Sequence, residues 1–144
     1  MLSGYFFLPF AVLSSALPSY IRDTTCSEPT TFTVRDLGIF TPSSSNTGPS
    51  RISFEVDNTT CSSNTILNPK NATACADTHY SYFWDGSSLT VQQVYTPCDN
   101  PTGLALVKGT ISDIALDCIP VESPYPLGDG TLCQTPTGEL SGEY

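Results

Sequence analysis

Six cysteines limit what this chain can fold into more than any other feature of its 144 residues. Their number is even, no CxxC pair occurs, and the chain has a single histidine, so the clustered ligands of a structural zinc site are missing and we expect no metal. An even set of cysteines in a small chain is typical of disulfides formed in an oxidising compartment. Spacing alone does not choose among the roughly fifteen pairings that six cysteines allow. The set comprises Cys26, Cys61, Cys75, Cys98, Cys118 and Cys133.

The N-terminus indicates which compartment this is. An apolar run, Tyr5–Leu13, is too short to span a bilayer, and Ser14 and Ala16 follow it at the small-residue positions of a cleavage site. No Lys or Arg precedes the run, which leaves a buried N-terminal strand as the alternative. We expect residues 1–16 to be a signal peptide and the mature protein to be secreted and extracellular.

Two sequons agree with secretion. Asn58-Thr59-Thr60 and Asn71-Ala72-Thr73 both fit the N-x-Ser/Thr rule, and we expect Asn58 and Asn71 to be N-glycosylated on the surface.

The charge of the chain excludes several kinds of partner. Fourteen acidic residues against five basic ones give a net charge of −9. Such a surface repels nucleic acid and anionic membranes, and no later run is long and apolar enough for a membrane helix. We expect neither nucleic acid nor membrane as a partner.

Strand patterns dominate the rest of the sequence. Apolar and polar residues alternate in Arg51–Asp57, and aromatic or apolar segments on either side of Asp85–Ser88 predict a hairpin. In the first strand the apolar phase slips between Val34 and Leu37, which indicates a bulge. We also expect a bulge or bend at Gly109.

These patterns predict one all-β domain. Short strands with frequent turns favour a compact antiparallel β-sandwich or barrel, stapled by disulfides. We expect residues 17–25 to form a short N-terminal segment, residues 26–133 the single disulfide-stapled domain, and residues 134–144 a flexible acidic tail. Turn-rich loops are predicted at residues 41–50 and 119–130.

Catalysis finds little support in the sequence. His79 is the only imidazole, and no nucleophile-elbow motif accompanies it. Asp85, Asp113 and Asp117 lie near predicted strand ends, but nothing pairs them as an acid and a base. We therefore predict no catalytic residues, no cofactor and no enzymatic activity.

An aromatic strand is the most distinctive candidate binding element. Tyr80, Tyr82 and Trp84 share one face of this strand, and Phe83 lies on the other. If the three rings are exposed, they form a platform for a sugar or a protein. If they are buried they are core, and apolar residues on both faces favour the core.

The order of these features resembles the small secreted β-barrel proteins of fungi typified by the Alternaria major allergen. An early cysteine precedes FTVRDL, ISFEV leads to TTCSS, TACAD follows, and YSYFW and SSLTVQQVY come before the last two cysteines. The resemblance spans residues 26–133. It implies a β-barrel-like sandwich, an extracellular location and no enzymatic activity. It also implies an elicitor, allergen or effector that meets host defence proteins.

The resemblance further implies a disulfide pattern. By position, Cys61–Cys75 and Cys118–Cys133 match the two intrachain bridges of the family. Type members use an early cysteine to join two chains, but here Cys98 gives Cys26 a partner within the chain. We expect a Cys26–Cys98 bond and a monomer.

Two functions follow as hypotheses. The first is a secreted non-enzymatic effector that binds a host extracellular defence protein. The alternative is an extracellular carbohydrate-binding or cell-wall-associated module, with Tyr80, Tyr82 and Trp84 as its platform. Exposure of these rings distinguishes the two.

Overall fold

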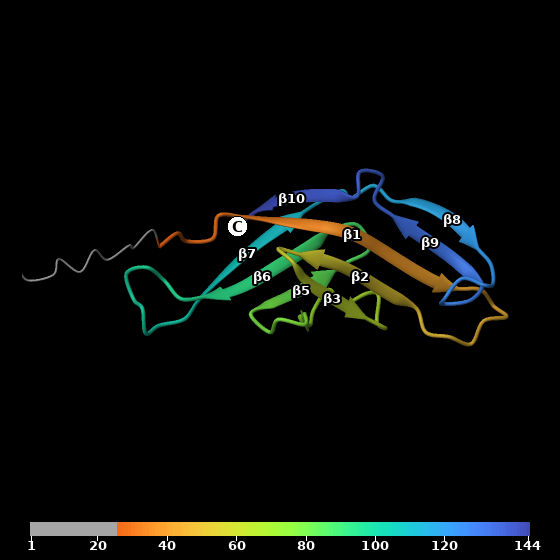
Figure 1. Cartoon of the computed structure of the whole chain (residues 1–144), viewed down its shortest axis with the longest axis horizontal. Coiled ribbons are helices and arrows are strands. Elements are labelled where there is room, and N and C mark those ends of the chain that lie inside the picture. Colours follow the sequence, from red (N-terminus) through yellow and green to blue (C-terminus); the bar gives the residue numbers. More distant parts are fainter. Residues whose placement is uncertain (1–25) are drawn as a thin grey trace, which may run out of the picture.

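The computed structural model describes residues 26–144, which contain ten β-strands and no helix (Figure 1). The expected signal peptide and the segment 17–25 lie outside the described residues. Within the part that is described, no helix meets the length and hydropathy needed to cross a membrane. The prediction of an all-β domain is confirmed.

Six of the strands form the first sheet. Its order is β3-β2-β1-β9-β8, and β10 pairs with the first half of β1 on the edge that β9 occupies further along. All pairings are antiparallel. The strands are β1 (Thr31–Pro42), β2 (Arg51–Val56), β3 (Thr59–Ser63), β8 (Asp117–Val121), β9 (Gly130–Gln134) and β10 (Glu139–Glu143).

The other four strands form the second sheet, in the order β4-β5-β6-β7 and again antiparallel. The predicted hairpin turn at Asp85–Ser88 joins β5 to β6. The strands are β4 (Thr73–Ala74), β5 (Tyr80–Trp84), β6 (Leu89–Tyr95) and β7 (Ala105–Ile111).

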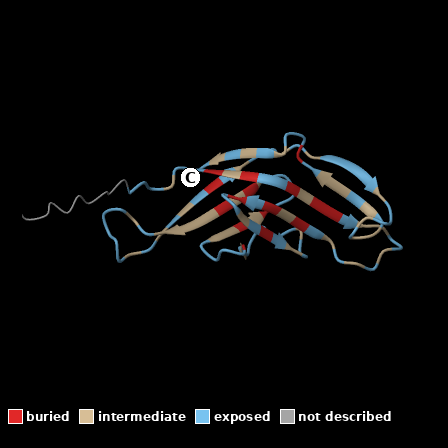
Figure 2. Ribbon diagram, in the orientation of Figure 1, coloured by how far each residue is buried: buried red, intermediate tan, exposed pale blue. Residues whose placement is uncertain are grey.

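The two sheets stack as a sandwich and do not close into a barrel. Most of the buried positions lie on β1, β2, β5 and β6, as the red segments of Figure 2 show, whereas β8 is exposed along most of its length. Phe54 of the first sheet meets Tyr82 of the second edge to face, with ring centroids 4.8 Å apart. The core between the sheets therefore lies at one end of the first sheet, and β8 and β9 extend beyond it.

A bulge in β1 allows this long strand to keep its apolar residues in the core. Its register with β2 shifts between Arg35 and Gly38, and Asp36 has a φ of 53°. The extra residue moves the buried positions from Phe32 and Val34 to the phase of Leu37 and Ile39. This prediction from the phase slip is confirmed.

The last eleven residues are not a flexible tail, contrary to expectation. β10 pairs with β1 from Thr31↔Glu143 to Arg35↔Glu139, and Arg35 forms an ion pair with Glu139 at 2.9 Å. The ring of Tyr144 packs 4.9 Å from that of Phe32. Backbone pairing and one half-buried ring order a segment whose side chains are mostly polar.

Gly109 is not a bulge, which corrects a second expectation. It pairs regularly with Val91, and a Cβ at this position would lie 2.1 Å from the Glu143 carbonyl oxygen. The glycine is needed because β7 of one sheet approaches β10 of the other very closely.

The loop predicted at residues 119–130 is shorter in the structure. Ile119 to Val121 belong to β8, which pairs with β9 up to Val121↔Gly130. Pro120 is tolerated because β8 is an edge strand.

Candidate interaction surface

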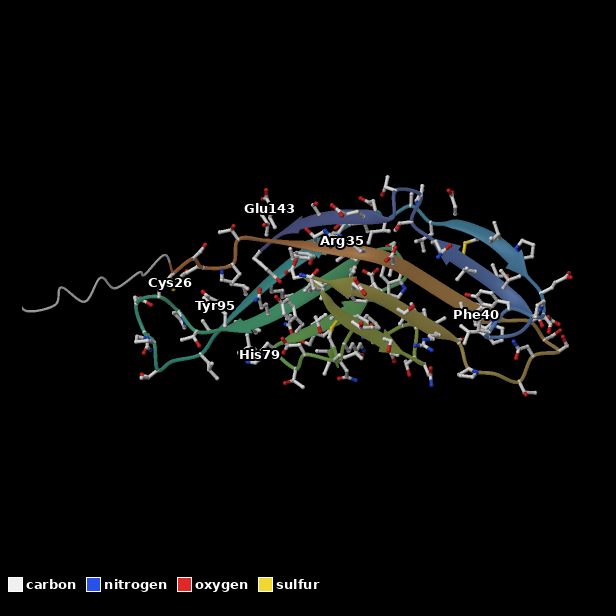
Figure 3. All side chains as sticks on the ribbon, viewed as in Figure 1. Cys26, Arg35, Phe40, His79, Tyr95 and Glu143 are labelled. Atoms are coloured by element: carbon white, nitrogen blue, oxygen red, sulfur yellow. A yellow bond between two sulfur atoms is a disulfide. The ribbon has the colours of Figure 1, made fainter. Side chains whose placement is uncertain are left out.

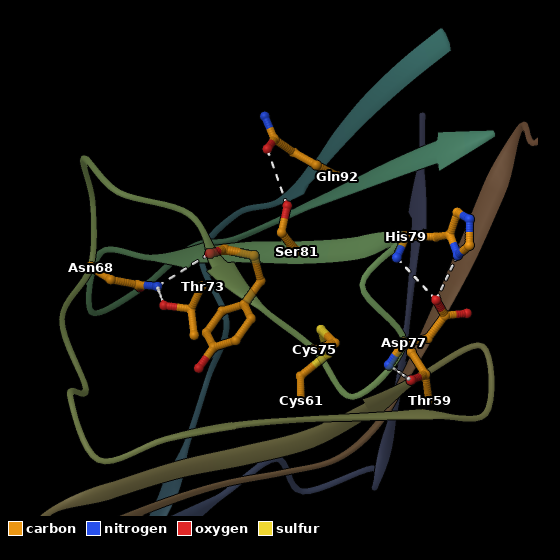
Figure 4. Close-up of a disulfide and its surroundings, with 10 residues drawn as sticks. Thr59, Cys61, Asn68, Thr73, Cys75, Asp77, His79, Ser81 and Gln92 are labelled. Carbon is orange, nitrogen blue, oxygen red and sulfur yellow. Dashed lines mark hydrogen bonds and ion pairs between the residues drawn. A yellow bond between two sulfur atoms is a disulfide. The ribbon is translucent and has the colours of Figure 1, made fainter. Parts of the chain in front are cut away.

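The structure contains three disulfides, and none of the cysteines is free. Cys61–Cys75 ties β3 to the end of β4 inside the core, so it joins the two sheets along one side (Figure 4). Cys118–Cys133 joins opposite residues of β8 and β9. Cys26–Cys98 joins the segment before β1 to the loop between β6 and β7. These are the pairs named from the sequence and the resemblance.

The aromatic row is core rather than an exposed platform. Tyr82 and Trp84 are 0% and 1% exposed, and Tyr80 is half-buried. β5 lies between β4 and β6, and this face of the strand meets the first sheet, so the rings fill the sandwich. Asn68, itself buried, donates to the Tyr82 carbonyl oxygen and accepts from the Trp84 amide, which fixes the strand further. The three rings do not supply the flat exposed surface that a sugar requires.

His79 is exposed and lies in the turn before β5. Its Nδ1 lies 2.7 Å from Asp77 Oδ1, and the same oxygen accepts a hydrogen bond from the His79 amide (Figure 4). The amide and then the ring of His79 lower the pKa of Asp77. Among the described residues the ring has no hydrogen bond besides that to Asp77. The pair stabilises a turn.

The three aspartates considered from the sequence lie apart. Asp85 accepts hydrogen bonds from the amides of Ser87 and Ser88, which lower the pKa of its carboxyl. Asp113 lies in the connection after β7 with a φ of 55°, and Asp117 begins β8. A lowered pKa is the opposite of what a general acid needs.

One cavity of the described region, about 520 Å³ in volume, lies beside β8 and is lined by Ser43, Glu122 and Asp129 among others. Asp129 accepts a hydrogen bond from the Ser123 amide at 2.6 Å, so it organises the loop. Across residues 26–144, no group of three or more His, Cys, Asp or Glu side chains could hold a metal ion.

Both sequon asparagines are exposed and lie on the same side of the sandwich. Asn58 occupies the tight turn between β2 and β3, where Asp57 and Asn58 have φ angles of 45° and 73°. The strand therefore turns back as a hairpin rather than leaving the sheet. Asn71 lies two residues before β4. Because β3 and β4 are edge strands joined by Cys61–Cys75, sugars at either asparagine would lie along this edge.

Exposed leucines occur at the opposite edge, which sequence reasoning missed. Leu104 is 75% exposed and Leu106 is 57% exposed, and Leu106 pairs with Val94 of β6. Strand alternation places Leu106 and Val94 on the face that points away from the core, opposite to Val91. We call Val94, Leu104 and Leu106 the hairpin cluster. An alternating pattern does not say which face of β6 and β7 is inward, so the sequence does not show that these leucines are exposed.

The hairpin cluster lies at one end of the molecule. The loop between β6 and β7 projects beyond the sandwich, near Cys26 and Tyr95, while Phe40 lies toward the other end (Figures 1 and 3). The Tyr95 hydroxyl donates to Glu28 at 3.4 Å, and Cys26–Cys98 fixes the loop to the start of the domain. The leucines therefore sit on an anchored hairpin.

Two solved structures of the Alternaria alternata allergen Alt a 1 have a similar fold. One is 14% identical, with a TM-score of 0.51, and the match covers 83% of this chain and 90% of that chain. The other, of the Alternaria alternata major allergen, is 13% identical with a TM-score of 0.52 and covers 78% and 90%. No family model and no curated protein matches the sequence. At this identity the likeness establishes the fold, and the resemblance expected from the sequence is confirmed at that level.

Proposed function

We propose that this chain, which has the fold of the Alternaria allergen, is a secreted non-enzymatic effector that binds a host extracellular defence protein. Three disulfides support the oxidising route of secretion. The residues that could have favoured an enzyme or a sugar platform have structural roles instead: His79 in a turn, Tyr82 and Trp84 in the core.

The observation that carries the proposal is the hairpin cluster. Large apolar side chains grouped on a small domain mark protein-binding sites, whereas scattered ones need no explanation. Leu104 and Leu106 lie close together in the chain, at an edge of the second sheet that both sequons leave free. A few side chains that become buried on binding supply most of the energy in protein interfaces.

A capture experiment tests the proposal. The secreted protein is immobilised and exposed to host apoplastic fluid, together with the variant Leu104→Ser/Leu106→Ser and the control Ile119→Ser. Ile119 is 55% exposed, like Leu106, but lies on β8. A defence protein retained by the wild type and by the control, and lost with the double variant, is the expected result. Equal retention by all three proteins would rule out the hairpin cluster as the binding surface.

A further inference from the structure

We infer that the host protein binds by adding an extended segment to the free edge of β7, with an acidic side chain of that segment opposite Lys108. This inference rests on the proposed function and adds how the partner is recognised. The reasons are the direction of the backbone groups of β7, the side chains beside them, and the state of the other outer strands.

The hydrogen bonds of the second sheet show which backbone groups of β7 are free. The Val94 amide donates to the carbonyl oxygen of His79, so the backbone groups of Val94 point toward β5. Leu106 of β7 lies directly opposite Val94. In an antiparallel ladder, opposite residues alternate between pairs that exchange hydrogen bonds and pairs that do not. Val94 and Leu106 are a pair of the second kind, so the backbone groups of Leu106 point away from β6.

The same alternation continues along β7. Lys108 also directs its amide and carbonyl away from β6, whereas those of Val107 point toward β6. Within residues 26–144, no backbone hydrogen bond besides the ladder with β6 involves residues 104–111. β10 meets β7 at Gly109, on the face that points to the core. Leu106 and Lys108 therefore each present a free donor and a free acceptor at the edge.

The side chains of these two residues lie beside their free backbone groups, on the face that points away from the core. Leu106 is 57% exposed, and Lys108 is exposed as well. The Lys108 ammonium lies 5.6 Å from the centre of the Phe83 ring and has no ion-pair partner in the described part of the chain. An added strand would set one side chain against Leu106 and the next on that face against Lys108. An apolar residue suits the first position, and Asp or Glu suits the second.

The other outer strands are less open to such an addition. β4 has only 2 residues, and on β3 the Thr60 carbonyl oxygen already accepts from the Ala76 amide. β8 contains Pro120, which has no amide to donate. β10 ends against β7, where Glu143 approaches Gly109. β7 has 7 residues and no proline, and an edge strand of this kind is a template for another strand.

A second copy of this chain suits the edge less well. If two β7 strands paired antiparallel about a twofold axis, Lys108 would lie opposite Leu104, Leu106, Thr110 or its own counterpart, depending on the register. None of these gives the ammonium a counterion, because β7 contains no acidic residue. The edge therefore favours a segment of another protein, and Lys108 selects for an acidic residue in it.

A proline at the edge tests the backbone pairing. Lys108→Pro removes the free amide without removing a hydrogen bond to β6, and its matched control Lys108→Ala removes the same side chain but keeps the amide. Apoplastic fluid is passed over the immobilised wild type and both variants. We expect Lys108→Ala to weaken retention of the leucine-dependent host protein by up to about fivefold. Lys108→Pro should weaken retention by about a further tenfold.

The outcomes separate this inference from the proposed function. Equal retention by Lys108→Pro and Lys108→Ala would overturn strand addition, and leucine-dependent retention would still leave the proposed function standing. Equal retention by the wild type and Leu104→Ser/Leu106→Ser would overturn both. A wild type that sediments as a dimer while Lys108→Pro sediments as a monomer would assign the edge to a second copy and overturn the inference. Urea unfolding followed by Trp84 fluorescence shows whether each variant folds like the wild type.

Charge reversal tests the acidic residue of the partner. Lys108→Glu should weaken retention more than Lys108→Ala does, and the difference should shrink as salt increases. The control Lys70→Glu makes the same charge change in the connection between β3 and β4, and it should have little effect. Stronger retention by Lys108→Glu, or equal weakening by Lys70→Glu, would refute an acidic side chain opposite Lys108.

Amide exchange of the wild type, resolved by NMR, gives a readout that needs no variant. In the free chain the amides of Leu106 and Lys108 should exchange faster than that of Val107, which points toward β6. With the recovered host protein bound, strand addition should slow exchange at Leu106 and Lys108 and change Val107 little. Unchanged exchange at Leu106 and Lys108, or equal slowing at all three amides, would overturn the inference.

Discussion

Replacing Gly109 by alanine should destabilise the protein, because Gly109 lies where the two sheets approach most closely. A Cβ there would lie 2.1 Å from the Glu143 carbonyl oxygen and 2.6 Å from Phe32 Cε1. Gly142 borders the same ring, since its Cβ would lie 2.2 Å from Phe32 Cζ. The Phe32 ring is thus held between two strands that have no side chain at the point of contact. β10 cannot retreat without stretching the hydrogen bond from the Tyr144 amide to Thr30, which is 2.9 Å long.

Two effects of opposite sign decide the magnitude. Forcing an additional methyl group into a packed core costs about 1–3 kcal/mol, whereas Gly→Ala stabilises by about 0.4–1 kcal/mol through the unfolded chain. The clash involves a backbone oxygen rather than a flexible side chain, so we expect the first effect to dominate and the free energy of unfolding to fall by about 1–2 kcal/mol. At Gly38 the nearest heavy atoms to an added Cβ are 3.9 Å away. Gly38→Ala should therefore be neutral or stabilising by up to about 1 kcal/mol.

Urea unfolding measures the difference between these variants. Trp84 is the only tryptophan and is 1% exposed, so its fluorescence reports loss of the core. With a urea m-value of about 2 kcal/mol per M, Gly109→Ala should lower the midpoint by roughly 0.5–1 M. Equal midpoints for Gly109→Ala and Gly38→Ala would show that β10 is not packed against β7 as described.

Three further predictions concern the Cys26–Cys98 disulfide, the buried hydroxyl of Tyr144 and N-glycosylation. The variant Cys26→Ser/Cys98→Ser opens a loop spanning 72 residues and should lower the free energy of unfolding by about 4 kcal/mol. Urea unfolding of the oxidised protein measures this loss, and an unchanged midpoint would contradict it. Tyr144 has a buried hydroxyl without a partner, so Tyr144→Phe should leave stability at neutral pH unchanged or raise it by up to about 2 kcal/mol. Burial also raises the pKa of Tyr144, so above about pH 10 the phenol ionises in the unfolded chain before it does in the folded protein. The wild type should therefore lose stability above about pH 10, and Tyr144→Phe should lose less. Equal losses of stability in the two proteins would refute this cause. Protein secreted from a eukaryotic host should lose mass on deglycosylation, and Asn58→Gln/Asn71→Gln should not; an unchanged mass of the wild type would refute glycosylation.

Much of the fold could be predicted from local patterns in the sequence. The bulge in β1 could be predicted because one extra residue shifts every later side chain to the opposite face, and this appears directly as the slip between Val34 and Leu37. The β5–β6 hairpin was equally accessible, since Asp85 and Gly86 have the turn chemistry that the connection requires.

Contacts between segments that are distant in the sequence were harder to predict. β10 carries few apolar residues, and its order comes from hydrogen bonds to β1 and from Tyr144 against Phe32. Gly109 was read as a bulge because the sequence does not reveal that another strand lies against it. Both errors have the same origin, which is a contact between segments distant in the chain.

The hairpin cluster could not be predicted from the sequence for a related reason. Leucines at positions 104 and 106 look like those of any apolar strand, and they are exposed because they lie on the face of the hairpin that points away from the core. The rings of Tyr82 and Trp84 could be assigned to the core beforehand, because Phe83 makes both faces of β5 apolar.

Hydrogen exchange of the chain, alone and saturated with the host protein that it retains, tests the central claim most directly. The backbone amides of residues 94–106 form the end of the hairpin, and a partner seated on Val94, Leu104 and Leu106 would shield them. We predict slower exchange concentrated in this segment, with little change in β8 and β9. Protection centred on β8 and β9, or none in residues 94–106, would contradict the assignment of the hairpin cluster as the binding surface.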